Sequence, residues 1–481
     1  MGSHARQSAV SLSLISVVLV LLVASASAAV PLTKISSDPY TNPSSQHKTQ
    51  VEPDTFAWGS TIVSAFQSGR FFDGGASNNG WATSTNGGSS WQMGFLPGLT
   101  KYEGNGPYDR VSDPSVAYDA RHGVWIISSL TLDDTPSVRP VSVVASRSSN
   151  GLSWTNPVTV GSGGSPDKNW TVCDNTPSSP FYGNCYTQWD DNGDGNRIKM
   201  STSTDGGLTW GPARNTADNA TGIAGQPLVR KNGVVIVPIA NAFVGSILYF
   251  KSTNGGASWQ ATKPVATITD HTVAGGLRSL PLPSAEIDNT NKTYIVWHDC
   301  RFRANCSAND IVMATIKRNT VSPVIRIPID PTNSGIDHFI PGLAVDRSTG
   351  GATTRLGLTY HYYPVSNCGQ NCQLHVGFIS STNGGTTWSA PTELAGPMSL
   401  TWLASTSQGR MVGDYISGSF VSGKTHPVFA VANAPVGGVF DEAMYSPVNG
   451  LLTAGAVATG NESPVTDRAD HPLPTKPVTV R

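Results

Sequence analysis

An eight-residue pattern, S-x-D-x-G-x-x-W, returns along the chain and limits its fold more than any other feature. The pattern is complete at residues 203–210, and it returns with Asn in the Asp position at 84–91, 252–259 and 381–388. A worn copy ends at Trp154, with Ser149 in the Asp position. Such repetition indicates that one structural unit recurs, and it decides the architecture.

The pattern suits a tight turn between two β-strands. An Asp or Asn side chain accepts hydrogen bonds from backbone N–H groups of a turn. The glycine adopts backbone angles that other residues resist, and the Trp buries a large ring against the sheet. Short β-rich runs precede the copies, as in ILYFKS before residue 253. Each copy is therefore expected to join two neighbouring antiparallel strands.

These segments resemble the Asp-box, or BNR, repeats of the sialidase-like β-propeller superfamily. The resemblance covers residues from about 50 to 450 and implies an all-β propeller with Asp-box turns. Successive units are roughly 50 to 65 residues long, which suits a four-stranded blade with its loops. Seven blades are the first interpretation, and six are the alternative if the last piece only completes another blade. The ring must also close, and an early strand pairing into the last blade is the usual device.

Four segments are expected along the chain: a signal peptide at 1–28, a linker at 29–50, the propeller at 51–450 and a loose tail at 451–481. The apolar run near the N-terminus is shorter than the ~20 residues that a membrane span needs. An Ala-rich stretch with the form of a cleavage site follows it. We therefore expect a secreted, extracellular protein with no membrane span in the mature chain.

Charge and cysteine content narrow the partners and the compartment. The formal net charge of −1 provides no overall field that would attract nucleic acid. A carbohydrate or glycoconjugate partner is expected instead. The six cysteines fall in three close pairs, and in a secreted chain local disulfides are the expected result. The pairs are Cys173 with Cys185, Cys300 with Cys306, and Cys368 with Cys372.

The path of the chain through a propeller selects candidate site residues, because residues entering the inner strand and leaving the second strand of each blade meet at one mouth. The repeated turns lie on the other face and are not the expected site. The catalytic candidates are Asp299, Asp414, Tyr415 and His361. The substrate-binding candidates are Arg70, Asp113, Asp167, Lys168, Arg278, Arg301, His338 and Arg410. Glu52 is expected near the axis, and Gln226, Asp190, His298 and Tyr362 on the same face.

These residue types fit chemistry on an acidic sugar. Arginine forks recognise carboxylates by paired hydrogen bonds. Carboxyl groups in a partly buried mouth can have pKa values far enough apart for acid/base cleavage of a glycosidic bond. The resemblance also implies a tyrosine nucleophile, as sialidases use. The pairs of opposite charge Asp299 with Arg301, and Arg410 with Asp414, are the preferred candidates.

Three functions remain open at this point. The first is a secreted sialidase-like glycosidase that cleaves a terminal acidic sugar or an acidic polysaccharide. The second is a uronate-specific polysaccharide lyase, in which His338 or His361 with a tyrosine removes the proton next to the carboxylate. The third is a propeller that binds a glycan or a protein without catalysis.

One loop suggests a structural metal, although no cofactor is required for the expected chemistry. Asp190, Asn192 and Asp194 form a D-x-N-x-D-G pattern, whose alternating oxygen ligands suit Ca²⁺. The twelfth position is Ser201 rather than Glu, so the loop is not an EF-hand. A solvated acidic hairpin is the alternative.

Overall fold

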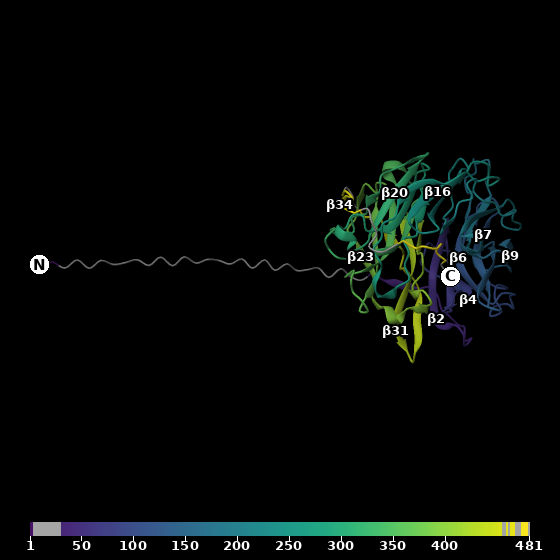
Figure 1. Cartoon of the computed structure of the whole chain (residues 1–481), viewed down its shortest axis with the longest axis horizontal. Helices are drawn as coiled ribbons and strands as arrows, with labels where there is room; N and C mark the ends of the chain where they lie inside the picture. Colours follow the sequence, from purple (N-terminus) through teal and green to yellow (C-terminus); the bar gives the residue numbers. More distant parts are fainter. Residues whose placement is uncertain (3–29, 455–457, 460–461, 467–472, 480–481) are drawn as a thin grey trace.

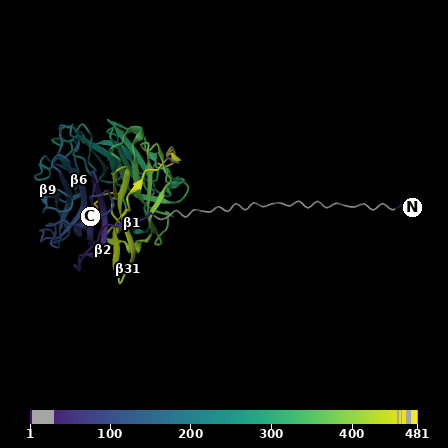
Figure 2. The same ribbon diagram turned by 180° about the vertical axis from the view of Figure 1, so that it is seen from behind.

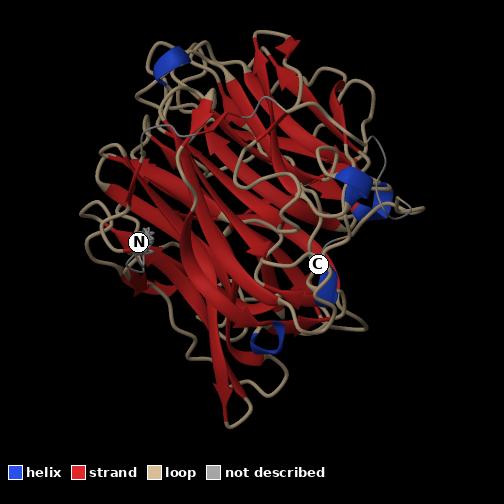
Figure 3. Ribbon diagram, turned by 90° about the vertical axis from the view of Figure 1, so that its left-hand side faces the viewer, coloured by secondary structure: helices blue, strands red, loops and turns tan. Residues whose placement is uncertain are grey.

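Strands make up almost all of the regular structure in this computed structural model. It describes residues 1–2, 30–454, 458–459, 462–466 and 473–479. The expected signal peptide lies outside these residues, apart from its first two. Short 3-10 helices lie at the periphery of the strands (Figure 3). They are η1 (Asn192–Asp194), η2 (Ala274–Gly276), η3 (Ala304–Cys306), η4 (Gly351–Thr353) and η5 (Leu400–Trp402).

The strands follow one another in antiparallel groups, which we number in chain order. Group 1 contains β2 (Gln46–Trp58), β3 (Thr61–Arg70), β4 (Ala76–Ser84) and β5 (Gln92–Phe95). Group 2 contains β6 (Arg110–Asp119), β7 (Val124–Asp133), β8 (Arg139–Ser148) and β9 (Val158–Ser162). Group 3 contains β10 (Pro166–Cys173), β11 (Cys185–Asp191) and β12 (Arg197–Ser203).

The next groups repeat this arrangement with shorter or split strands. Group 4 contains β13 (Gly222–Ile223), β14 (Leu228–Val229), β15 (Val235–Asn241), β16 (Ser246–Ser252) and β17 (Lys263–Thr267). Group 5 contains β18 (Ser284–Ile287), β19 (Thr293–Asp299), β20 (Asp310–Lys317), β21 (Thr320–Val321) and β22 (Ile325–Arg326). Group 6 contains β23 (Asp337–Val345), β24 (Leu356–Tyr363), β25 (Gln373–Ser381) and β27 (Thr392–Ser399).

The last group joins the two ends of the described chain. Group 7 contains β30 (Ser417–Val421), β31 (Lys424–Val436), β32 (Val439–Pro447) and the early strand β1 (Leu32–Lys34). Thr49 of β2 also lies opposite Glu442 of β32. Figures 1 and 2 show the first strands, in purple, beside the last strands, in yellow. An early strand thus pairs into the last group, as ring closure requires.

The first strand of each group contacts the first strand of the next, and the sequence of contacts returns to its start. β2 lies against β6, β6 against β10, β10 against β14, and β14 against β18. In group 4 the first strand is split into β13 and β14, which both pair with β15. β18 lies against β23, β23 against β30, and β30 against β2. We call the line enclosed by these first strands the axis. Side chains that project from the beginnings of these strands therefore meet, although they lie far apart in sequence.

Two segment boundaries differ from those expected. Residues 32–34 and 46–50 of the expected linker are strands, because β1 and β2 pair with β32. The described parts of the expected loose tail are hydrogen-bonded to the rest of the chain. β33 (Leu451–Leu452) pairs with β31, and β34 (Ala458–Thr459) pairs with β26 (Thr387–Trp388). The N–H of Val465 donates to the carbonyl of Arg301, and that of Val478 to the carbonyl of Ala242.

The repeated pattern occupies turns with recurring hydrogen bonds. In group 3 the Asp205 carboxylate accepts from the N–H groups of Leu208 and Thr209, both at 3.0 Å. In group 4 the Asn254 side chain accepts from the N–H of Ser258 at 3.0 Å. In the worn copy it is Asn150, rather than the residue before it, that accepts from Leu152 and Ser153 at 2.8 and 2.9 Å. The assignment of Ser149 to the Asp position was therefore wrong.

Three disulfides tie loops locally. They join Cys173 to Cys185, Cys300 to Cys306, and Cys368 to Cys372, as the spacing predicted. These bonds are consistent with an extracellular protein. Among the described residues, none of the helices has the length and apolar character needed to cross a bilayer.

Candidate functional site

The first strands of three groups share a backbone irregularity that orients charged side chains. Glu52 in β2, Asp113 in β6 and Lys168 in β10 have φ angles of 63°, 44° and 46°. In each strand the pairing with the second strand shifts register at this residue. A bulge of this kind changes the direction of the side chain, and residues other than glycine adopt such φ angles only when the surroundings impose them.

Lys168 holds three carboxylates together at the axis. Its Nζ lies 2.5 Å from Oε1 of Glu52, 3.1 Å from Oδ1 of Asp113 and 2.7 Å from Oδ2 of Asp414. All four side chains are buried. Four segments separated in sequence therefore contribute to one cluster, because their strands follow one another around the axis.

Two arginines complete the group of charges. Nε and Nη2 of Arg278 lie 2.8 and 2.5 Å from the two oxygens of Asp414. Arg70 donates from Nη1 to Oε1 of Gln67 at 2.8 Å, and the Gln67 amide donates to Glu52. We call Glu52, Arg70, Asp113, Lys168, Arg278 and Asp414 the axial cluster. Its three cations and three carboxylates balance in formal charge.

The surroundings separate the pKa values of the carboxyl groups. Burial raises the pKa of Glu52 to about 8, although Lys168 opposes the shift. Burial also favours the neutral form of Asp414, but Arg278 and Lys168 together hold its pKa well below the usual range. Glu52 therefore holds a proton near neutral pH while Asp414 stays ionised. Environments that differ in this way are typical of acid/base sites, and also occur in structural ion networks.

Tyr415 lies against the cluster as a proton donor. Its hydroxyl donates to the carbonyl oxygen of Pro114 at 3.2 Å. Burial, and then the charges of Glu52 and Asp113, raise its pKa well above the usual value. The Nζ of Lys168 lies 5.2 Å from the centre of its ring. The phenol therefore stays protonated in this structure.

The axial cluster is closed on the side where an open mouth was expected. A hairpin of β28 (Ala404–Thr406) and β29 (Gly409–Met411) adjoins it. The N–H of Arg278 donates to the carbonyl of Arg410 at 2.7 Å, and the N–H of Glu52 to that of Val412 at 3.1 Å. The cavity beside Lys168 and Tyr415 has about 20 Å³ of free space. That volume holds about one water molecule, so a sugar does not fit in it as the structure stands.

Asp299 and Arg301 form the expected ion pair outside the axial cluster. Nη2 of Arg301 lies 2.6 Å from Oδ2 of Asp299, and Nε lies 2.8 Å from Oδ1. The Asp299 carboxylate also accepts from the N–H and hydroxyl of Thr269, at 3.1 and 2.6 Å. These bonds anchor the segment after β17 to the end of β19. Arg410 does not pair with Asp414; its Nη1 donates to the carbonyl of Leu403 at 2.9 Å.

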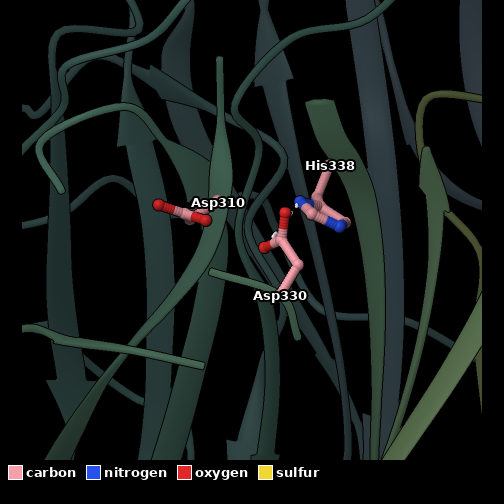
Figure 4. A group of neighbouring side chains, drawn as sticks. All are labelled: Asp310, Asp330 and His338. Atoms are coloured by element: carbon pink, nitrogen blue, oxygen red, sulfur yellow. Dashed lines mark ion pairs between the residues drawn. The ribbon is translucent and has the colours of Figure 1, made fainter. Parts of the chain in front are cut away.

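His338 lies beside a second buried group of charges. Figure 4 shows Asp310, Asp330 and His338 directed toward one another. Both carboxylates already bind guanidinium groups: Nη2 of Arg303 lies 2.5 Å from Asp310 and 2.7 Å from Asp330. Arg326 lies 2.9 Å from Asp310 and 2.7 Å from Asp330. A metal ion would have to displace these guanidinium groups, so the donor set favours a structural ion network.

Both candidate histidines are buried and neutral. Burial lowers the pKa of His338 to about 3, and it does the same for His361. The aromatic ring of Tyr360 lies 5.5 Å from that of His338, edge to face. A buried imidazole with so low a pKa is a weak base. Nδ1 of His338 lies 3.3 Å from the carbonyl oxygen of Asn309.

The polar side chains of the predicted calcium loop contact other protein groups. Oδ1 of Asn192 accepts from the hydroxyl of Thr479 at 2.9 Å, and its amide donates to Asp167 at 2.9 Å. Asp194 lies 3.3 Å from Arg197 and is half exposed. Burial raises the pKa of Asp190 well above its usual value. The calcium site stays a prediction.

Sequence reasoning missed two parts of the site. Gln67, which links Arg70 to Glu52, carries no motif. Asp54 lines the axial space two residues after the bulge, accepts from the N–H of Val116 at 2.7 Å, and has its pKa raised to about 7 by burial. The signal was present in the related tripeptides E-P-D at 52–54 and D-P-S at 113–115. Both have the bulge residue first, followed by proline.

Comparisons with known proteins bear on the fold. No family model matches the sequence, and no curated protein matches it closely enough to count as a relative. An ulvan lyase bound to -[GlcA(1-4)Rha3S]- is 10% identical, with 86% of this chain and 95% of the lyase covered and a TM-score of 0.50. A leech intramolecular trans-sialidase is 11% identical, with 72% of this chain and 70% of the trans-sialidase covered and a TM-score of 0.46. A Trypanosoma rangeli sialidase is 12% identical, with 87% of this chain and 60% of the sialidase covered and a TM-score of 0.43. The chain therefore shares its fold with a polysaccharide lyase, and sialidases are among its structural neighbours.

Proposed function

We propose that this chain is a secreted carbohydrate-active enzyme, built on a seven-bladed propeller, that hydrolyses an acidic sugar at the axial cluster. The ring of contacts between first strands supports the seven blades. One observation carries the function. A carboxylate, that of Asp414, is held by the Arg278 fork and by Lys168, with Glu52 on the same lysine.

The two cations supply the carboxylate-binding part of this site. A guanidinium fork recognises a carboxylate by two parallel hydrogen bonds. When the β28–β29 hairpin opens, a sugar carboxylate replaces Asp414 on Arg278 and Lys168. The displaced Asp414 then lies beside the sugar as an ionised carboxylate.

Glu52 supplies the proton. Its pKa of about 8 keeps it protonated at neutral pH, which is what a general acid for the leaving oxygen requires. In this assignment Glu52 is the acid in place of the catalytic candidate Asp299, which hydrogen-bonds to Thr269. Asp414 and Tyr415 keep their places as catalytic candidates, and Arg70, Asp113, Lys168 and Arg278 as the groups that position the sugar.

Elimination from a uronate is the second candidate, supported by the likeness in fold to the ulvan lyase. The same two cations would neutralise the uronate carboxylate and so acidify the neighbouring proton. The obstacle to elimination is that no candidate residue is well suited to act as the base. Tyr415 has a raised pKa, and the pKa values of His338 and His361 are lowered to about 3. Hydrolysis therefore fits the charges better.

The test uses the secreted protein on sialosides, uronate-containing gums and pectic fragments. New reducing ends without absorbance from unsaturated uronates support hydrolysis, and absorbance supports elimination. Glu52→Gln should abolish the activity, whereas Asp299→Asn, which changes a carboxyl outside the cluster, should keep it if the protein remains folded. Binding of these glycans without any product would refute the enzyme and leave a binding propeller.

A further inference from the structure

A larger cavity lies at the other end of the axis. It has about 500 Å³ of free space and is lined by the end of β2, by β18, by the segment after β23 and by the β30–β31 turn. We call it the distal cavity and define it by Phe56, Trp58, Glu286, Arg347 and Phe420. Glu52 and Trp58 belong to the same strand, six residues apart, so this cavity lies ~20 Å from the axial cluster at the rise of an extended strand.

A partly exposed aromatic side chain, Trp58, lines this cavity. Trp58 is 42% exposed. Its ring stacks on that of Tyr118, with centres 5.3 Å apart and planes 29° from parallel. Because Tyr118 supports one face of the indole, the orientation of the ring is fixed by the protein. Large apolar side chains exposed at a concave surface are typical of binding sites.

A charged pair lies in the wall of the same cavity. Nη2 of Arg347 lies 3.0 Å from Oε2 of Glu286, and both side chains are partly exposed. The guanidinium also lies over the Phe56 ring, 5.0 Å from its centre. This stacking restricts the guanidinium, so its hydrogen-bond donors and the carboxylate acceptors are held in one place. The pair has no net charge, and it offers both donors and acceptors to a ligand.

A sugar ring matches this combination. The C–H face of a pyranose is apolar and packs on an aromatic ring, while its hydroxyl groups both donate and accept hydrogen bonds. A cavity of this size lies within the range that holds small ligands, which suits one or two sugar units. The cavity is also lined by Asp346, which pairs with Nη1 of Arg355 at 3.2 Å. Each charge in the wall therefore has a partner of opposite sign, and the matching ligand is an uncharged saccharide.

We propose that the distal cavity is a second, non-catalytic site that binds a neutral pyranose of an oligosaccharide or polysaccharide. It is separate from the axial cluster, because the cavities between them have only about 30 and 20 Å³ of free space. One sugar cannot lie in both. The proposal does not depend on the enzymatic function above, and it gives the protein a means to stay attached to a polysaccharide.

The test measures binding of cellohexaose, maltohexaose and xylohexaose by titration calorimetry. We expect at least one of them to bind the wild type, and Trp58→Ala to weaken that affinity about ten-fold or more, as loss of a central aromatic contact does. Arg347→Ala should weaken it as well. Phe243→Ala removes an exposed aromatic from the β15–β16 turn and should leave the affinity unchanged.

Three outcomes would overturn the proposal. In the first, none of the three hexasaccharides binds the wild type. In the second, one binds, but Trp58→Ala, with a circular dichroism spectrum and Tm like the wild type, binds it equally well. Glu52→Gln separates the two sites: it should keep this binding even if it abolishes cleavage of acidic glycans. Loss of binding in Glu52→Gln alone would place the saccharide at the axial cluster and refute the distal site.

Discussion

Replacement of Lys168 by Met tests whether the axial cluster depends on its lysine. The Nζ lies within 3.1 Å of Glu52, Asp113 and Asp414, and methionine keeps most of the side-chain volume without the charge. Glu52 already holds a proton near neutral pH, and Asp414 keeps the Arg278 fork. Asp113 then lacks the neutralising partner that the lysine supplied.

The expected loss in the free energy of unfolding follows from the one carboxylate that is left without a partner. Removing one partner of a buried ion pair destabilises a protein by about 3 to 5 kcal/mol, because a buried charge is left uncompensated. The same change at the surface has a far smaller effect, of about 1 kcal/mol or less. Lys101 provides the matched control, since its Nζ lies 2.8 Å from Asp109 and both side chains are partly exposed.

The assay is equilibrium unfolding in guanidinium chloride at pH 7, with both variants and the wild type. We expect Lys168→Met to lower the free energy of unfolding by about 3 to 5 kcal/mol, and Lys101→Met by about 1 kcal/mol or less. A loss at pH 7 equal to that of Lys101→Met would refute the reasoning.

Three further predictions follow from the charges and the repeated turns. The pKa of Glu52 rises from 4.5 to about 8 on folding. Its contribution to stability is therefore complete below pH 4.5 and is lost as pH rises through 8. Glu52→Gln should flatten that part of the curve of Tm against pH, and an unchanged slope would contradict the assignment. Trp388 is fully buried, so Trp388→Ala should lower the free energy of unfolding by about 3 to 5 kcal/mol. This is more than Trp91→Ala should, because the Trp91 ring is only partly buried; equal losses would count against the burial argument. Asp205 accepts two backbone N–H groups, so Asp205→Ala should destabilise by about 1 kcal/mol, whereas Asp194→Ala, in an exposed loop, should have little effect; denaturant midpoints decide between them.

Local patterns were sufficient for the strands, the turns and the disulfides. The S-x-D-x-G-x-x-W segments predicted turns because their hydrogen bonds form within a few residues, as at Asp205 and Asn254. The cysteine pairs are separated by 12, 6 and 4 residues, so the chain itself brings each pair together. The worn copy shows the limit of this approach, since a one-residue shortening moved the acceptor to Asn150.

The partners within the candidate site were beyond local patterns. Sequence reasoning placed Asp113, Lys168, Arg278 and Asp414 on one face, but it gave Asp414 a neighbour in sequence, Arg410, as the preferred partner. The structure pairs Asp414 with Arg278, 136 residues away. Which charges meet depends on the bulges and on the order of strands around the axis, and neither is a property of one segment.

The sequence by itself determined that this chain builds repeated antiparallel units with capped turns, because period, turn chemistry and hydrophobic alternation act over a few residues. Only the tertiary structure decided that β1 enters the last group, that the β28–β29 hairpin adjoins the axial cluster, and that burial raises the pKa of Glu52. The physical reason is that burial and charge neighbours come from strands distant in sequence. The pKa of a buried group, and the access to the axial cluster, therefore depend on strands from the whole ring.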